Sequence, residues 1–215
     1  GQGNYGSGGP GTYEVCVSPT DATTQITLPS TPAVAPGFIV GLANGSVQQW
    51  SATDGWTELH DGTWGSAITA MVTYGEGIVV GLSNGSVEKW NGPGTNPDPL
   101  TWSANWTELQ TESSIGQSVT GIIVHQGSSP QDDGIVVAMS KQSAPSLTSH
   151  LVQFWDPTRG WTELQTGTGT AVTAMTGYRA FGKAIDGVAV GYSDGAVRYW
   201  DGTIGYHSGW EELPT

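Results

Sequence analysis

The stretch GIVVGLSNGSVEKWNG, residues 77–92, decides the fold, because nearly the same sequence occurs twice more in the chain. The other two copies are GFIVGLANGSVQQWSA at 37–52 and GVAVGYSDGAVRYWDG at 187–202. Each has an apolar run, an Asn-Gly or Asp-Gly pair and a second run that ends in Trp, a pattern typical of a β-hairpin. We expect type I′ turns at Asn44-Gly45, Asn84-Gly85 and Asp194-Gly195.

The hairpin belongs to a longer repeat unit that occurs four times. The four hairpins span 37–50, 77–90, 134–155 and 187–200, and each precedes a Trp-Thr-Glu-Leu type segment at 56–60, 106–110, 161–165 or 210–214. A further β-type run precedes three of the hairpins, at 67–74, 118–125 and 171–178. These segments predict four short strands in each unit. A single such sheet cannot bury both of its faces, so the units are expected to stack on one another.

We predict an all-β β-propeller of four blades, each with four antiparallel strands. The units lie near 30–66, 67–116, 117–170 and 171–215 of a single domain over 12–215, and residues 1–11 form a flexible Gly-rich tail. The first unit lacks a clear inner strand, so residues 12–29 are expected to supply extra closing strands. The alternative is half of an eight-bladed ring that a dimer closes. We further expect a protruding loop over 140–150 and a Pro-rich insertion over 93–104.

The repeat resembles β-propeller blades, of WD-repeat type in general pattern. The segments Trp200-Asp201-Gly202 and Gly209-Trp210 are also similar to the blades of small sugar-binding propeller lectins. The resemblance covers about 37–215 and implies shape alone. The Gly-His and final Trp-Asp signature of WD repeats is absent, and the Arg with which fucose-binding propellers grip the sugar is replaced by Ile39, Val79, Val136 and Ala189.

Charge and composition exclude several classes of partner. The net charge is −13 with only six Lys and Arg, which disfavours nucleic acid and anionic membranes. We see no 18-residue apolar run and no leader segment. The single cysteine, Cys16, cannot form an internal disulfide, and we interpret it as a small apolar side chain. No motif predicts a cofactor.

Two sets of carboxylates are candidates for a site. Glu58, Glu108, Glu163 and Glu212 recur in the outer segments, where a charge either discourages edge-to-edge aggregation or contacts a ligand. Because they lie on separate blades, we expect them not to pair as glycosidase carboxylates do, and we predict no enzyme. Glu76, Asp133 and Asp186 precede the hairpins and are weak candidates for a Ca²⁺ ring; tight turns explain them better.

The tryptophans divide into two groups. Two per unit recur regularly and indicate packing between blades. They are Trp50, Trp56, Trp90, Trp106, Trp155, Trp161, Trp200 and Trp210. Trp64 and Trp102 lie outside the repeat, in predicted loops, and are candidates for stacking on a sugar ring; replacing either by Ala should leave the fold intact.

These observations predict a non-catalytic binding module that recognises a glycan or a cell-surface protein through loops between blades. The alternative is a structural or scaffold protein of an extracellular or virion surface. A lectin should expose Trp in several equivalent pockets, whereas a scaffold should show an apolar contact on one face. The low charge and the Ser-, Thr- and Gly-rich composition suit an extracellular or surface-exposed monomer or homodimer.

Overall fold

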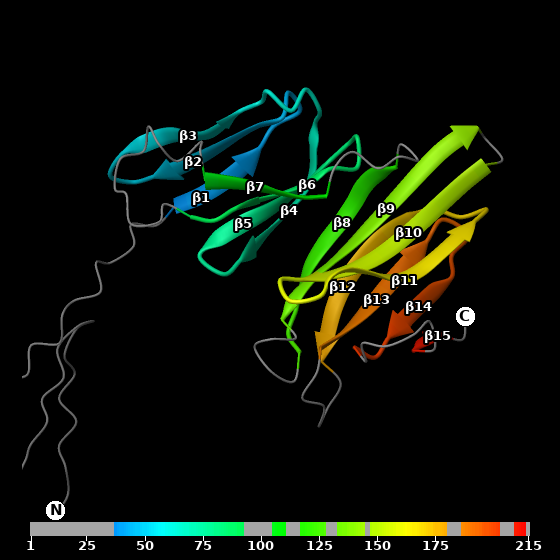
Figure 1. The fold of residues 1–215 in the computed structure, drawn as a ribbon. Coiled ribbons are helices and arrows are strands. Elements are labelled where there is room, and N and C mark those ends of the chain that lie inside the picture. The colour runs from blue at the N-terminus through cyan, green and yellow to red at the C-terminus, as the bar shows by residue number, and fades with distance from the viewer. Residues whose placement is uncertain are drawn as a thin grey trace, which may run out of the picture.

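A computed structural model describes residues 37–92, 105–110, 117–127, 133–144, 147–179, 186–202 and 209–213. In these ranges the chain forms four separate antiparallel sheets, and each follows chain order from one edge to the other (Figure 1). The Gly-rich tail, the expected closing strands at 12–29 with Cys16, and the insertion at 93–104 with Trp102 lie outside the described residues. No helix in the described ranges could cross a membrane.

The opening stretch builds the centre of the second sheet. Its four strands are β4 (Ile68–Tyr74), β5 (Gly77–Leu82), β6 (Val87–Trp90) and β7 (Trp106–Gln110). The third sheet repeats the plan with β8 (Ser118–His125), β9 (Gly134–Ala144), β10 (Leu147–Asp156) and β11 (Gly160–Thr168). The fourth contains β12 (Val172–Arg179), β13 (Asp186–Tyr192), β14 (Val197–Trp200) and β15 (Trp210–Glu212). The four-stranded unit that the repeat predicts is thus confirmed.

The first sheet has three described strands: β1 (Gly37–Gly41), β2 (Ser46–Ser51) and β3 (Gly55–Asp61). They correspond to the second, third and fourth strands of the other sheets. In the described part of the chain β1 is therefore an edge strand, where the other sheets carry an inner strand.

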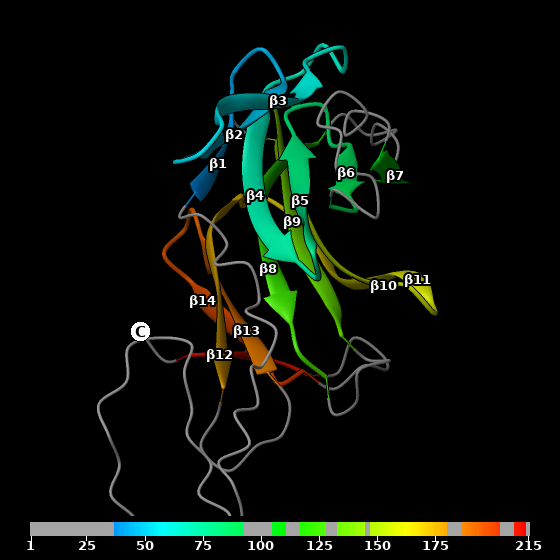
Figure 2. The same ribbon diagram turned by 90° about the vertical axis from the view of Figure 1, so that its left-hand side faces the viewer.

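Consecutive sheets stack face to face, as blades do. The inner strands β4, β8 and β12 pack against one another in turn, and the outermost strands β7 and β11 lie away from them (Figure 2). The chain is therefore an all-β propeller of four blades, the first of them partial.

The core lies in the three seams between consecutive blades. The central strand β5 is apolar on both sides: Ile78 and Val80 pack with the first blade, whereas Val79 packs with the third. The last seam joins Phe154 and Leu164 to side chains of the fourth blade, Trp200 among them. Because period-two alternation sends neighbouring residues to opposite faces, a continuous apolar run here marks a strand buried on both sides.

The predicted type I′ turns are wrong in detail. Gly85 N donates to Leu82 O at 3.0 Å and Leu82 N donates to Ser86 O at 3.0 Å, so the loop has three residues and its turn is centred on Ser83-Asn84. Gly85 follows with φ of 93°. This is the hairpin in which a glycine closes a bulge after the turn. Asn84 Oδ1 accepts from Ser86 N at 3.0 Å, which favours the longer loop.

The expected protruding loop at 140–150 is also wrong. Strands β9 and β10 continue pairing outward as far as Ala144 and Leu147, so only 145–146 separate them. The Ser- and Thr-rich segment lacks an Asn-Gly pair. A polar run can still form strands where the ladder extends from a well-packed hairpin.

Candidate binding surfaces

The four outer-strand glutamates are exposed and stand at equivalent positions. Glu58, Glu108, Glu163 and Glu212 each pair across strands with a polar side chain: Gln48, Glu88, Gln153 and Arg198 respectively. In the last pair, Arg198 Nε lies 3.3 Å from Glu212 Oε2. Sequence reasoning missed the partners. Their signal was present: a polar residue two positions before each hairpin Trp.

The pair in the second blade brings two carboxylates together. Glu88 is only 7 % exposed, and its burial, with the charge of Glu108 as a second cause, raises the pKa of Glu88 to about 7. Cross-strand neighbours are about 5 Å apart at Cβ, a separation at which like charges repel. Glu88 comes from the hairpin arm β6, so this pair joins two neighbouring strands of one blade and not two outer strands.

The outer-strand tryptophans connect the blades by a repeated hydrogen bond. Nε1 of Trp106 donates to the Leu59 carbonyl at 2.8 Å, and Nε1 of Trp161 donates to that of Leu109 at 2.7 Å. The third bond runs from Trp210 Nε1 to Leu164 O at 3.0 Å. In every case the Trp belongs to one blade and the Leu to the blade before it. We call this the seam bond.

The hairpin tryptophans reinforce the same seams. Trp90 and Trp200 are almost completely buried, at 4 % and 1 % exposure. Trp155 packs against the core between the second and third blades while staying partly exposed. Most repeated tryptophans therefore pack between blades, as their regular spacing indicates.

Trp64 lies in the loop after β3, but its ring is not free. It stacks on His60 with centroids 3.4 Å apart and planes 10° from parallel, and its edge contacts Trp106 at 4.9 Å. Burial lowers the pKa of His60, and its Nδ1 accepts a hydrogen bond from Gly62 N at 3.0 Å. One face of Trp64 is thus unavailable for stacking on a sugar.

The three acidic residues before the hairpins occupy different structural positions. Glu76 is exposed in the two-residue turn between β4 and β5. Asp133 Oδ1 accepts from Gly127 N at 3.0 Å, which closes the connection before β9. Asp186 begins β13 opposite Arg179. No group of three potential metal-ligating side chains occurs within the ranges that the structure describes.

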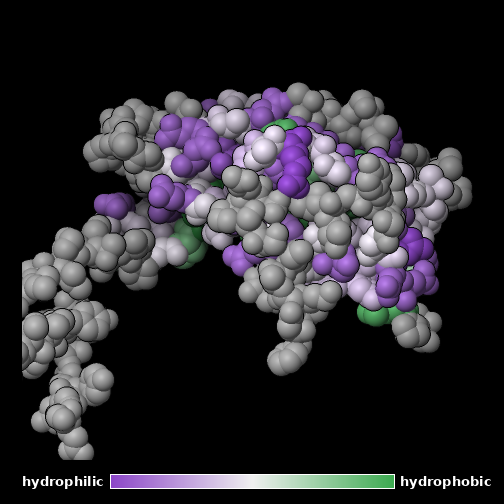
Figure 3. All heavy atoms as spheres, turned by 60° about the horizontal axis from the view of Figure 1, so that its bottom comes forward, coloured by the Kyte–Doolittle hydropathy of each residue, from purple (hydrophilic) through white to green (hydrophobic). Residues whose placement is uncertain are grey.

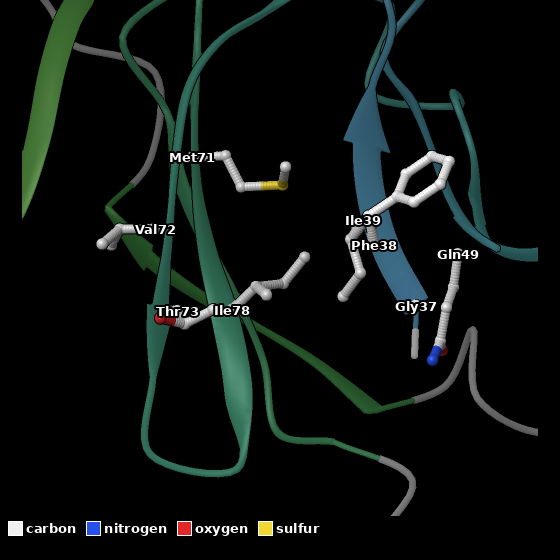
Figure 4. A pocket seen from close by; sticks show the side chains of 8 residues that line it. All are labelled: Gly37, Phe38, Ile39, Gln49, Met71, Val72, Thr73 and Ile78. Carbon is white, nitrogen blue, oxygen red and sulfur yellow. The ribbon is translucent and has the colours of Figure 1, made fainter. Parts of the chain in front are cut away.

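A pocket lies between the first and second blades, beside the β1 edge. Its volume is about 330 Å³, and Met71 and Ile78 reach across it toward Ile39 (Figure 4). The remaining lining comes from Gly37, Phe38, Gln49, Val72 and Thr73. The lining is mainly apolar and offers few hydrogen-bonding groups to a sugar.

Exposed apolar side chains concentrate on the first and last blades. The large ones are Phe38, Leu42 and Trp56 on the first blade and Leu213 on the fourth, among the described residues. Phe38 stacks on Trp50 with centroids 5.4 Å apart and meets Trp56 edge-on at 5.6 Å. The face in Figure 3 is mostly hydrophilic, with small hydrophobic areas toward its two ends.

Comparison with known proteins gives likeness in fold only. No protein family and no curated protein matches the sequence. Among solved structures, the chain is similar to the computationally designed Ika4 protein at 22% identity and a TM-score of 0.46, over 75% of this chain and 82% of that one. The designed Ika8 protein matches at 24% identity and 0.43, over 76% of this chain and 42% of that one, so the chain spans about two fifths of the length of Ika8. A chain of a mitotic checkpoint complex matches at 15% identity and 0.26, over 93% and 88%.

Proposed function

We propose that this chain is a non-catalytic binding module whose ligands are glycans. The observation that carries the proposal is the fourfold recurrence of an exposed carboxylate, Glu58, Glu108, Glu163 or Glu212, at one register position of the outer strand. A carboxylate accepts hydrogen bonds from sugar hydroxyls, and the facing Gln48 and Gln153 add amide donors and acceptors. Four weak sites at equivalent register positions bind a branched or repeated glycan through avidity.

The lectin-like blade pattern in the sequence implies the shape of the blades alone, so the proposed ligand class rests on the outer-strand carboxylates. The sites we assign differ from those of the fucose-binding propellers, whose Arg position holds apolar residues here. Trp102, outside the described residues, stays a candidate for stacking, and Trp64 keeps at most one ring face for it.

A scaffold role is the second candidate, and a different observation favours it. The exposed Phe38, Trp56 and Leu213 form apolar surface on the first and last blades, where a subunit could dock. This role needs no glycan. The two candidates can therefore be separated by one binding experiment.

The experiment measures retention on a broad glycan array. The full chain is compared with a variant carrying Glu58→Gln, Glu108→Gln, Glu163→Gln and Glu212→Gln. The variant should lose at least tenfold in apparent affinity, whereas the exposed turn variant Glu76→Gln should bind as the wild type does. Far-UV circular dichroism and thermal melting verify that both variants fold. A wild-type chain that binds nothing on the array overturns the glycan proposal and leaves the scaffold role.

A further inference from the structure

The seam bond occurs at all three junctions between the described blades, and its donor and acceptor positions in the first and last blades have no partner among the described residues. By position in the repeat, the fourth donor is Trp56 and the fourth acceptor is the Leu213 carbonyl. Trp56 is 56 % exposed, and its Nε1 makes no hydrogen bond to any described residue. The first and last blades therefore carry the two unused halves of a fourth seam.

The side chains around these two groups agree with that assignment. At the seams within the chain the corresponding leucines pack against the next blade: Leu59 and Leu164 are buried, and Leu109 is partly buried. Leu213, in contrast, is 44 % exposed, and no described blade packs over it. Phe38 is likewise 52 % exposed beside Trp56. A seam closed over these residues would bury the large apolar side chains that the described chain leaves in water.

The two halves do not meet within one chain. Strands β1–β3 lie at one end of the molecule and β15 at the other in Figure 1. Joining them in one chain would require all three existing seams to open or rotate. Each of those seams already has its Trp–Leu hydrogen bond and its buried core cluster.

We propose that the first blade of one chain docks on the fourth blade of a second copy, and the reverse, so that two chains close an eight-bladed ring. The contact joins two different surfaces, and such contacts repeat until a ring closes. Propellers typically have four to eight blades. Two copies supply eight, whereas three would supply twelve. The new seams use Trp56 Nε1 as donor to the Leu213 carbonyl of the other copy.

The closing seam differs from the internal ones at the position after the outer-strand Trp. Glu211 stands where the other blades carry Thr57, Thr107 and Thr162. Its carboxylate already accepts a hydrogen bond from Tyr199 of the same blade, which reduces its need for another donor.

The first test is the mass of the full chain in solution, measured by sedimentation equilibrium at micromolar concentration. The expected mass is twice 22.4 kDa. Leu213→Asp, and separately Trp56→Ala, should shift the protein to the monomer mass with the circular dichroism spectrum unchanged. A wild-type monomer, an open series of larger oligomers, or a dimer that survives both variants overturns the proposal.

The second test assigns the contact to two copies. In a Cys16→Ser background, one batch carries Trp56→Cys and the other carries Leu213→Cys. Mixing them under oxidation should give a covalent dimer, whereas neither batch alone should. A double variant that crosslinks only within the monomer would show that one chain closes by itself and would overturn the proposal. Neither readout involves glycan binding, so this inference can fail while the proposed function stands.

Discussion

At the residue scale, the hairpin loops contain equivalent glycines whose replacement by alanine should lower stability by different amounts. Gly45 and Gly195 close equivalent three-residue loops in the first and fourth blades and have φ of 87° and 90°. A Cβ on Gly45 would lie 2.6 Å from the Ser66 carbonyl oxygen, whereas a Cβ on Gly195 would meet nothing within 4 Å. The two positions share backbone strain and differ in space.

Gly195→Ala should therefore lower the free energy of unfolding by about 1–2 kcal/mol, the cost of a left-handed backbone for an L residue. Gly45→Ala should cost at least about 1 kcal/mol more, because the Ser66 carbonyl must also move. Urea unfolding of both variants measures the difference. Equal losses of stability in the two variants would mean that the loop after β3, which contains Ser66, moves away from the new methyl group without cost.

Glu88 makes the stability of the chain depend on pH. The pKa of this carboxyl is raised from 4.5 to about 7, so between these values the folded chain holds a proton that the unfolded chain has released. The contribution of Glu88 to stability is fully present below pH 4.5 and is lost as the pH rises through 7.

The free energy of unfolding should thus fall by about 1–2 kcal/mol from pH 5 to pH 8, less than the full shift implies, because water screens the pair. Glu88→Gln should flatten this decline. The matched control is Glu163→Gln, whose cross-strand partner is Gln153 and which should keep the slope. An unchanged slope in Glu88→Gln would assign the decline to other groups.

At the element scale, the strands matter through the seams that they form. The β6 residue Trp90 fills the first seam beside Leu59 and Ile78. Trp64, although it lies in a loop, packs against the same cluster through His60 and Trp106. The loop between two blades thus adds a stacked pair to their junction.

Trp90→Ala should lower the free energy of unfolding by about 3–5 kcal/mol, because a large cavity opens between two sheets. Trp64→Ala should cost about 1–2 kcal/mol, since it removes a stacked, partly buried ring. Denaturant midpoints with a common slope measure both values. A Trp64→Ala cost within about 0.5 kcal/mol would return Trp64 to the freely exposed position that the sequence suggests.

At the scale of the whole molecule, the blades form a series with two unlike ends. Each of three equivalent seams joins a Trp to a Leu by a hydrogen bond, whereas Trp56 and Leu213 occupy the same two positions at the ends of the series and are exposed. A repeat protein stabilises each unit through its neighbours, so terminal units need a cap, a ring or a partner. This is why the assembly state and the binding surfaces are linked in this chain.

The sequence by itself determined the order of the strands and the four-stranded plan of the second, third and fourth sheets. Apolar runs separated by turn dipeptides are local signals, and β8 begins and ends at the expected residues, Ser118 and His125. The recurrent Trp also marked the seams, because packing between equivalent sheets needs the same residue types each time. The prediction of two-residue turns from the Asn-Gly and Asp-Gly pairs was wrong. The loop after β5 has three residues, a length that the hydrogen bond from Ser86 N to the Asn84 side chain favours.

Only the tertiary structure decided which side chains face one another. The pairing of Glu88 with Glu108 depends on strand register, and the stacking of Trp64 on His60 depends on where a loop folds back. The seam bond joins residues more than forty positions apart, so no local pattern could reveal it. Hydrogen bonds, burial and pKa depend on distances in space, and only the stacking of the blades fixes these.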